Sequence, residues 1–374
     1  MLKSFRIVGN QMGRAQKIGI WQVFSIIFLS RLLTVLTYTS IGEEKMETGD
    51  YFPSVLFAGL FILLFSVMLF VQNKKYPGKD LTDIAYMASP WFSKVISVVY
   101  ALIFTFSMLV TLARLELFVG TIIFPENDSA LFIIICVLAS CYAASLGIEA
   151  LGRVSALSIM ISCAAFLFIL VTMADKIDVT QFSPAFFDGP LPSVKGGLSF
   201  ASRTVEIVML SALLPKINGK PLRAYFAWLS VTVLSMLSLF FFVFGGLGKF
   251  ALTQLFPVHS VAVLAEVGVF RRFDVLLTGV WILSAFIKIS LLLYLQAELL
   301  QKSFKAEWKN YYIFVVGGVA LVAQLFLAGN FTDYFYQTSF ITRFIYFAAV
   351  VLVIPAIIML CAYLKRRKSD EKNA

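Results

Sequence analysis

Long apolar runs, separated by short polar connections, fill almost the whole chain. A transmembrane helix needs about 20 predominantly apolar residues to cross the hydrocarbon core of a bilayer. Ten segments reach this length within a few residues: 18–39, 51–71, 94–118, 130–148, 154–173, 198–214, 224–247, 273–296, 312–328 and 342–363. The roughly ten-residue alternation of barrel strands is absent from them. The pattern therefore predicts an all-α polytopic membrane protein with ten transmembrane helices.

One long polar connection divides these segments into two halves. Residues 174–197 are rich in Asp, Pro and Gly and are too polar to span, so we expect them to form a loop outside the membrane. Five segments precede the loop, in residues 18–173, and five follow it, in residues 198–363. The second half then enters from the opposite side, as in the inverted repeats of many secondary transporters. From the count alone, we predict one integral membrane domain over residues 1–374, built as a 5+5 inverted repeat of the LeuT/APC type.

The composition supports a membrane protein and excludes several soluble classes. The chain is 60% hydrophobic and 14% charged, whereas soluble domains average about 45–50% apolar and about 25% charged residues. A soluble enzyme, a nucleic-acid-binding protein and a disordered chain are therefore excluded. The net charge of +10 concentrates in alternate connections and in the basic tail at residues 364–374. Because cytoplasmic loops collect Lys and Arg, we predict that both termini are cytoplasmic.

The sequence offers no chemistry typical of an enzyme or a metal site. It contains no HExxH, GxSxG or GxGxxG motif and no complete P-loop. Its four cysteines lie in apolar runs without CxxC spacing, as expected of small buried thiols. A single histidine, His259, cannot build a metal site alone. We predict no enzymatic activity, no metal and no cofactor.

Ionisable residues inside the apolar segments are the candidates for function. Arg31 lies in the first span, Arg203 and Glu206 in the sixth, and Lys288 in the eighth. A charge at mid-bilayer costs roughly 2.5–3.5 kcal/mol on insertion scales, so such groups usually face a bundle interior or a wet cavity. Arg203 and Glu206 are three residues apart and can pair, which would equally suit a purely structural role. The excess of cations favours a small anionic or zwitterionic ligand, such as an amino acid.

Other charged residues have a structural interpretation. Glu149 and Arg153 lie one helical turn apart between the fourth and fifth spans, and we expect them to form an architectural pair. Arg114, near the outer end of the third span, is expected to reach the membrane interface. The amphipathic segment 79–93 is too short to cross and predicts an interfacial helix.

Several short stretches together resemble one known family. They are Tyr76-Pro77-Gly78-Lys79-Asp80-Leu81, Ala113-Arg114-Leu115-Glu116-Leu117-Phe118, Gly147-Ile148-Glu149-Ala150-Leu151-Gly152-Arg153, Asp188-Gly189-Pro190-Leu191-Pro192, Gly268-Val269-Phe270-Arg271-Arg272-Phe273-Asp274 and Phe286-Ile287-Lys288-Ile289-Ser290 after Trp281. Over most of its length the chain resembles the B subunits of spore germination receptors, the GerAB-type permease-like proteins. The stretches Gly147–Arg153 and Trp281–Ser290 carry the most specific part of the likeness.

The resemblance implies a fold, a role and partners. The fold would be that of the amino acid–polyamine–organocation transporter superfamily, and the role would be to sense nutrient germinants in the inner membrane of the spore. The partners would be a membrane-bound A subunit and a lipoprotein C subunit. Members of the family carry breaks in spans one and six. Here the first span has no Gly or Pro between Trp21 and Ile41, and the sixth is expected to be unbroken from Leu198 to Glu206. Either side chains replace the helix ends in binding, or the protein binds something else.

The leading hypothesis is a germinant receptor subunit with a ligand between spans one, three, six and eight. Arg31 would meet the ligand carboxylate and Glu206 its amine, with Lys288 nearby. Neutral hydrogen bonds would come from hydroxyl side chains, namely Thr34, Ser107, Ser202 and Ser284. Two alternatives remain open. One is a secondary amino-acid transporter of the cytoplasmic membrane, and the other is a structural subunit whose buried charges only specify helix pairing.

Overall fold

The computed structural model describes residues 16–38, 46–125, 129–265, 273–304, 309–327 and 340–373, which are mainly helical. The α-helices are α2 (Ile20–Leu36), α3 (Tyr51–Phe65), α4 (Val67–Lys75), α5 (Leu81–Ala88), α6 (Pro90–Phe118), α7 (Ala130–Ser145), α8 (Ile148–Met173), α9 (Leu191–Ala201), α10 (Glu206–Leu213), α11 (Pro221–Leu247), α12 (Pro257–Leu264), α13 (Asp274–Phe304), α14 (Lys309–Leu327), α16 (Phe340–Ala348) and α17 (Ile354–Asn373). Short 3₁₀ turns are η1 (Thr48–Asp50), η3 (Ala174–Lys176), η4 (Val179–Phe182), η5 (Leu214–Lys216) and η6 (Gly248–Thr253), and the π-helical turns are η2 (Val119–Ile123) and η7 (Ala349–Val353).

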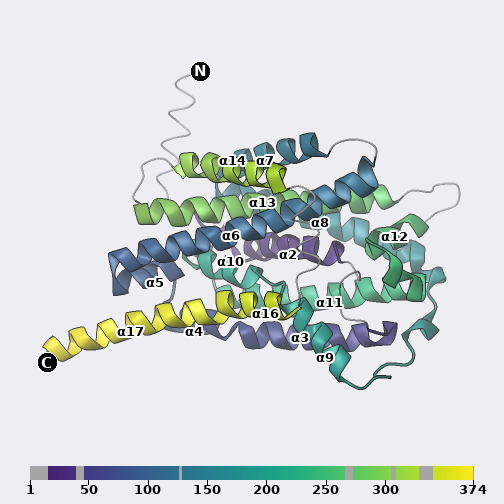
Figure 1. Ribbon diagram of the computed structural model, residues 1–374, viewed down its shortest axis with the longest axis horizontal. Helices are drawn as coiled ribbons and strands as arrows, with labels where there is room; N and C mark the ends of the chain where they lie inside the picture. Colours follow the sequence, from purple (N-terminus) through teal and green to yellow (C-terminus); the bar gives the residue numbers. More distant parts are fainter. Residues whose placement is uncertain are drawn as a thin grey trace.

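The helices form a bundle whose long members run along a common direction (Figure 1). In the described part of the chain, seven helical stretches are long and apolar enough to cross a membrane. Three shorter apolar helices accompany them: Ile20–Leu36, Ala130–Ser145 and Asn310–Phe326. Each of these ten stretches overlaps one predicted span. The structure therefore confirms a helical polytopic membrane protein, while ten membrane crossings and the boundaries of the two halves stay predictions.

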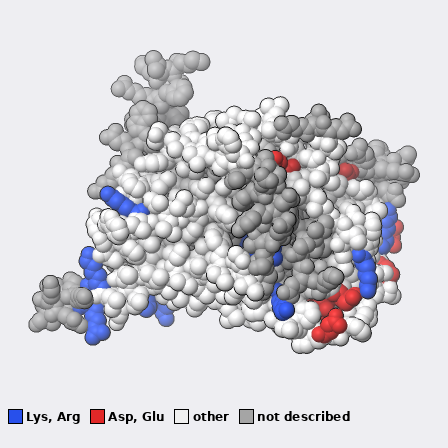
Figure 2. All heavy atoms as spheres, viewed as in Figure 1, with Lys and Arg blue, Asp and Glu red and all other residues white. Residues whose placement is uncertain are grey.

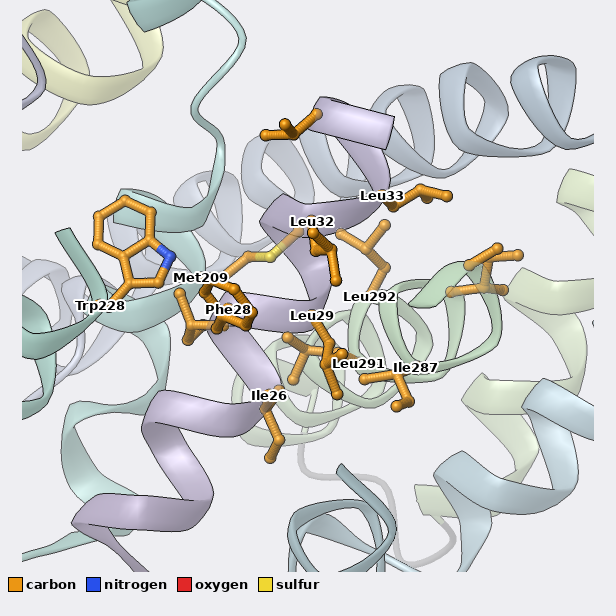
Figure 3. Close-up of a cluster of buried hydrophobic side chains, with 14 of the residues drawn as sticks. Ile26, Phe28, Leu29, Leu32, Leu33, Met209, Trp228, Ile287, Leu291 and Leu292 are labelled. Carbon is orange, nitrogen blue, oxygen red and sulfur yellow. The ribbon is translucent and has the colours of Figure 1, made fainter. Parts of the chain in front are cut away.

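Helix α2 lies at the centre of the bundle. It is buried on nearly every side and packs against α8, α11 and α13. Figure 3 shows its apolar side chains, among them Phe28 and Leu29, meeting Met209 of α10, Trp228 of α11 and Leu291 of α13. A helix that carries apolar side chains on every face, as α2 does apart from a few polar residues, is typical of such a central position. The helix is continuous, as the lack of Gly and Pro predicts.

The sixth span is broken, so the prediction of an unbroken helix was wrong. Helix α9 ends at Ala201 and α10 begins at Glu206, with a turn between them in which the Thr204 amide donates to the Ala201 carbonyl. Polar side chains explain the break, since short hydroxyl groups compete for helix carbonyls. The Ser202 hydroxyl, for example, donates to the Ser199 carbonyl at 2.8 Å.

The sixth span also starts earlier than predicted. Helix α9 begins at Leu191 rather than near residue 198, with Pro192 in its first turn, where proline's missing N–H is not needed. A short parallel pair of strands, β1 (Ile18–Gly19) and β2 (Ile217–Asn218), ties the chain after α10 to the start of α2.

The predicted interfacial segment forms a short helix, α5, joined to the end of α13. Asp80 caps α5 by accepting the Asp83 amide at 2.8 Å. The Lys302 ammonium of α13 donates to Asp80 and, at 3.3 Å, to Asp83. Helix α6 then starts at Pro90. This ion-paired corner fixes one end of α13 against the start of α5.

Two glycines allow α9 and α3 to pack closely. A Cβ atom on Gly197 would lie 2.5 Å from the Phe57 Cβ and 2.8 Å from the Ser54 carbonyl oxygen. A Cβ on Gly196 would lie 2.8 Å from the Ser54 hydroxyl. The close approach positions the end of α9, and with it the break in the sixth span.

His259 of α12 lies beside the Asp274 carboxylate at the start of α13. Its Nε2 lies 3.8 Å from the Asp274 Oδ2, and its ring packs edge-on against Phe118, which stacks on Trp281. Burial lowers the pKa of His259, and the neighbouring Asp274 carboxylate opposes that shift without overcoming it. The folded protein therefore favours neutral His259.

We expect Gly197→Ala to destabilise the protein by about 1–3 kcal/mol, the usual range for overpacking, because the neighbouring backbone leaves no room for a methyl group. The matched control is Gly279→Ala in α13, where a Cβ has nothing within 4 Å and helix propensity favours alanine by roughly 0.8–1.0 kcal/mol. Thermal unfolding of the purified protein in detergent measures both. Equal stability of the two variants would contradict the packing argument.

We also expect the protein to become less stable as the pH is lowered, and we expect His259 to contribute to this loss. Since the folded-state pKa lies below the unfolded value of about 6.5, the unfolded chain binds more protons as the pH falls through that value, and the folded state loses stability. Between about pH 7.5 and about pH 5.5, the unfolding temperature should drop further for the wild type than for His259→Gln. Identical pH profiles for the two proteins would exclude this contribution.

Candidate functional site

A buried ion pair lies at the break in the sixth span. Glu206 is the first residue of α10, and its Oε1 accepts from the Lys288 ammonium of α13 at 3.0 Å. The side chains of Lys288 and Glu206 are 6% and 0% exposed. Away from water, an unpaired charge is costly, so each of these residues depends on the other.

Helix α2 completes this pair with hydrogen bonds. The Lys288 ammonium also donates to the Thr34 hydroxyl at 3.1 Å and to the Ser30 carbonyl at 3.3 Å. The Ser30 hydroxyl donates to Glu206 Oε1 at 3.1 Å. The other carboxylate oxygen, Oε2, is buried and accepts no hydrogen bond from the residues that the structure describes. The cluster of Ser30, Thr34, Glu206 and Lys288 thus joins α2, α10 and α13.

Arg31 binds the broken end of α9. Its Nη2 donates to the Phe200 carbonyl and its Nη1 to the Arg203 carbonyl, each at 3.0 Å. Carbonyls at a helix C-terminus lack partners within the helix and carry partial negative charge, which a cation stabilises. Arg31 is 2% exposed and is therefore held by the backbone of the sixth span. This contact gives a physical reason for the break to persist within the bundle.

A cavity of about 290 Å³ lies beside this cluster. Its walls come from α2, α6, the turn between α9 and α10, α13 and the last span. Four of the residues predicted from the sequence line it: Thr34, Ser107, Ser202 and Lys288. The other three, Arg31, Glu206 and Ser284, are buried but are not among its lining residues.

The cavity walls carry more positive charge than the sequence suggests. Besides Lys288, the lining residues include Arg114, Arg203 and Arg343, and none of the described lining residues is acidic. Arg114 is 7% exposed and donates to the Thr37 hydroxyl at 3.3 Å, so its side chain lies inside the bundle, and its depth in the membrane stays a prediction. The position of Arg114 within an apolar span could have identified it from the sequence as a candidate site residue. Arg343 gave no such signal, since it stands at the edge of the last span.

The last span closes one side of the cavity with an irregular helix. Between α16 and α17 the chain forms the π-helical turn η7, and Val350 and Val351 of this turn line the cavity. Tyr346, one turn earlier, packs against Phe106 of α6 with ring centroids 5.2 Å apart. Single π-helical turns occur often at functional sites, because they change the direction in which side chains point.

The remaining predicted pairs lie elsewhere or have other partners. Arg153 and Glu149 approach to 3.7 Å at the start of α8, with 77% and 45% of their side chains exposed. Such exposed pairs contribute little stability, about 0–1 kcal/mol. Glu206 pairs with Lys288, across helices, and Arg203 lines the cavity. The sequence could not show the Glu206–Lys288 contact, because 82 residues separate its two partners.

The comparisons with known proteins agree with this architecture. A profile of a spore permease family, described as "Spore germination protein", matches residues 17–332. Among solved structures, the chain is similar to Mhp1, a nucleobase-cation-symport-1 family transporter, in a closed conformation with bromovinylhydantoin bound. The TM-score is 0.69 at 13% identity, over 92% of this chain and 78% of that one. A search of individually curated proteins gives no match.

The chain is therefore a permease-like membrane protein with the fold of the transporter Mhp1. The chain belongs to the spore germination protein family of permeases, as the GerAB-type resemblance predicted. The family and the fold are those of permeases and transporters and not those of enzymes.

We expect Lys288→Met to destabilise the protein by about 3–5 kcal/mol, because it leaves the buried Glu206 carboxylate without its counter-charge. The double variant Lys288→Met/Glu206→Leu removes both charges and should recover most of that loss. Thermal unfolding in detergent compares the two variants with the wild type. A single variant as stable as the wild type, or a double variant less stable than the single one, would show that the two residues are not coupled.

Proposed function

We propose that this protein is the permease-like subunit of a nutrient germinant receptor and that its cavity binds a small amino-acid-like ligand to trigger spore germination. One observation carries the proposal: in a member of the spore germination family, a cavity lined by cations lies against a broken membrane helix. Arg114, Arg203 and Arg343 offer guanidinium groups, which bind carboxylates with two parallel hydrogen bonds.

The arrangement of the cavity walls suggests how binding would be sensed. The ligand would contact the turn between α9 and α10 as well as the last span, two parts of the chain that are far apart in sequence. A ligand that fits one packing of these elements better than another shifts the population toward it. Partner subunits would then read the change. By the family resemblance, those partners are the A subunit and the lipoprotein C subunit.

We also propose a location and an orientation. The protein would lie in the inner membrane of the spore with both termini in the cytoplasm. In Figure 2, Lys and Arg atoms lie near the end of the molecule where α17 ends and also in the opposite half, whereas the visible Asp and Glu atoms lie toward that opposite half. Basic residues favour the cytoplasmic side, which supports a cytoplasmic end of α17.

A secondary amino-acid transporter is the second candidate. The broken sixth span favours it, since discontinuous helices form the substrate sites of many transporters, and the fold is shared with the transporter Mhp1. Uptake of labelled amino acids by reconstituted vesicles, with and without an ion gradient, separates the two functions. Gradient-driven uptake supports the transporter, and binding without uptake supports the receptor.

We expect Val110→Trp, which fills the cavity from α6, to raise the germinant concentration needed for germination by about tenfold or more, equivalent to about 1.4 kcal/mol of binding free energy. The matched control is Leu102→Trp on the same helix, where the side chain is 64% exposed on the outer surface. Germination of spores carrying each variant at the normal protein level is scored against germinant concentration. A normal response of Val110→Trp would exclude this cavity as the germinant site.

A further inference from the structure

We infer that the surface where α5, the start of α6 and the end of α17 meet binds an anionic phospholipid from the adjoining leaflet of the membrane. This surface, which we call the basic junction, consists of Lys79, Tyr86, Trp91, Lys94, Lys365 and Arg366. None of these residues lines the cavity, and the inference does not depend on the proposed germinant.

Contacts between segments far apart in sequence bring two of these cations to α5. Helix α17 packs along α5, as Figure 1 shows at the end of the molecule where α17 ends. The Lys365 ammonium donates to the carbonyl of Ala88, the last residue of α5. The Lys79 ammonium lies 3.5 Å from the Met87 sulfur. The two ammonium groups therefore contact neighbouring residues of the same short helix.

The positive charge of the junction is not cancelled by these contacts, since a thioether sulfur and a backbone carbonyl are neutral. The acidic side chains at the start of α5, Asp80 and Asp83, are ion-paired with Lys302 of α13. Lys94 and Arg366 add two exposed cations. A basic cluster at the membrane surface attracts anionic lipid headgroups, and Lys and Arg bind phosphate oxygens through charge-assisted hydrogen bonds.

Aromatic and apolar side chains beside the cations match the rest of a phospholipid. Tyr86 is 56% exposed and Trp91 is 72% exposed, and both side-chain types favour the headgroup level of a bilayer. On α17, the exposed side chains of Leu360 and Leu364 precede the two cations and offer an apolar surface to an acyl chain. Because cations and exposed apolar groups adjoin one another, the junction fits an amphiphile better than a free anion or an acidic protein segment.

The test compares two phospholipids that have the same acyl chains and different headgroups. Phosphatidylglycerol carries a net negative charge, and phosphatidylcholine does not. Each lipid is titrated into the full-length protein in detergent, and native mass spectrometry counts the lipids bound. We expect phosphatidylglycerol to bind at least about tenfold more tightly than phosphatidylcholine. Inorganic phosphate should not compete with it.

Variants assign the binding to the basic junction. Lys79→Gln and Lys365→Gln should each weaken phosphatidylglycerol binding by about fivefold, the effect of removing one cation near an anionic membrane surface. The pair Lys94→Gln and Arg366→Gln provides a second reading if the first pair does not fold. The matched control is Arg153→Gln, which removes one charge from an exposed side chain at the start of α8 and should leave the affinity unchanged.

Equal affinity for the two phospholipids would overturn the inference, and so would a loss in Arg153→Gln as large as in the junction variants. If inorganic phosphate or a soluble polyglutamate peptide displaces phosphatidylglycerol, the junction binds a free anion or an acidic protein segment, and the lipid is excluded. A preference for phosphatidylglycerol that is lost only in the junction variants supports the lipid site. Each of these outcomes leaves the proposed germinant function to its own germination assay.

Discussion

The structure depends on a buried ion pair placed at an interrupted helix. The Lys288 ammonium and the Glu206 carboxylate neutralise each other at 3.0 Å, and Arg31 binds the carbonyls where α9 ends. Without these contacts, the bundle would hold isolated charges and open backbone groups in a region with little water, each costing several kcal/mol. The same contacts fasten the central helix α2 to α10 and α13, and Lys288 of α13 also lines the cavity.

Because of this constraint, some of the charged residues stabilise the fold and others line the cavity. The sequence predicts that Arg31 and Glu206 bind a ligand, yet in the structure both side chains are bound by other groups of the protein. Arg114, Arg203 and Arg343, which the sequence gives a lesser role, line the cavity instead. In a membrane protein, a buried charge must first be stabilised by the fold, and a charge on a cavity wall can in addition contact a ligand.

The sequence predicted the fold well because apolar run length and charge asymmetry are properties of short segments. The ten apolar stretches and the continuous first helix follow from such local patterns. The break in the sixth span was missed, although Ser202, Arg203 and Thr204 form a polar interruption at that place. The pairing of Lys288 with Glu206, and the convergence of Arg114 and Arg343 on one cavity, depend on the packing of helices far apart in sequence, which no local pattern records.

Helix α13 has a mechanical consequence of its own. Its 31 residues make a rod about 46 Å long at 1.5 Å per residue, well beyond the roughly 30 Å of a hydrocarbon core. Asp274 meets His259 at one end, Lys302 meets Asp80 at the other, and Lys288 lies between them. A small tilt about the centre of this rod would therefore displace both of its ends, and with them the contacts to His259 and Asp80.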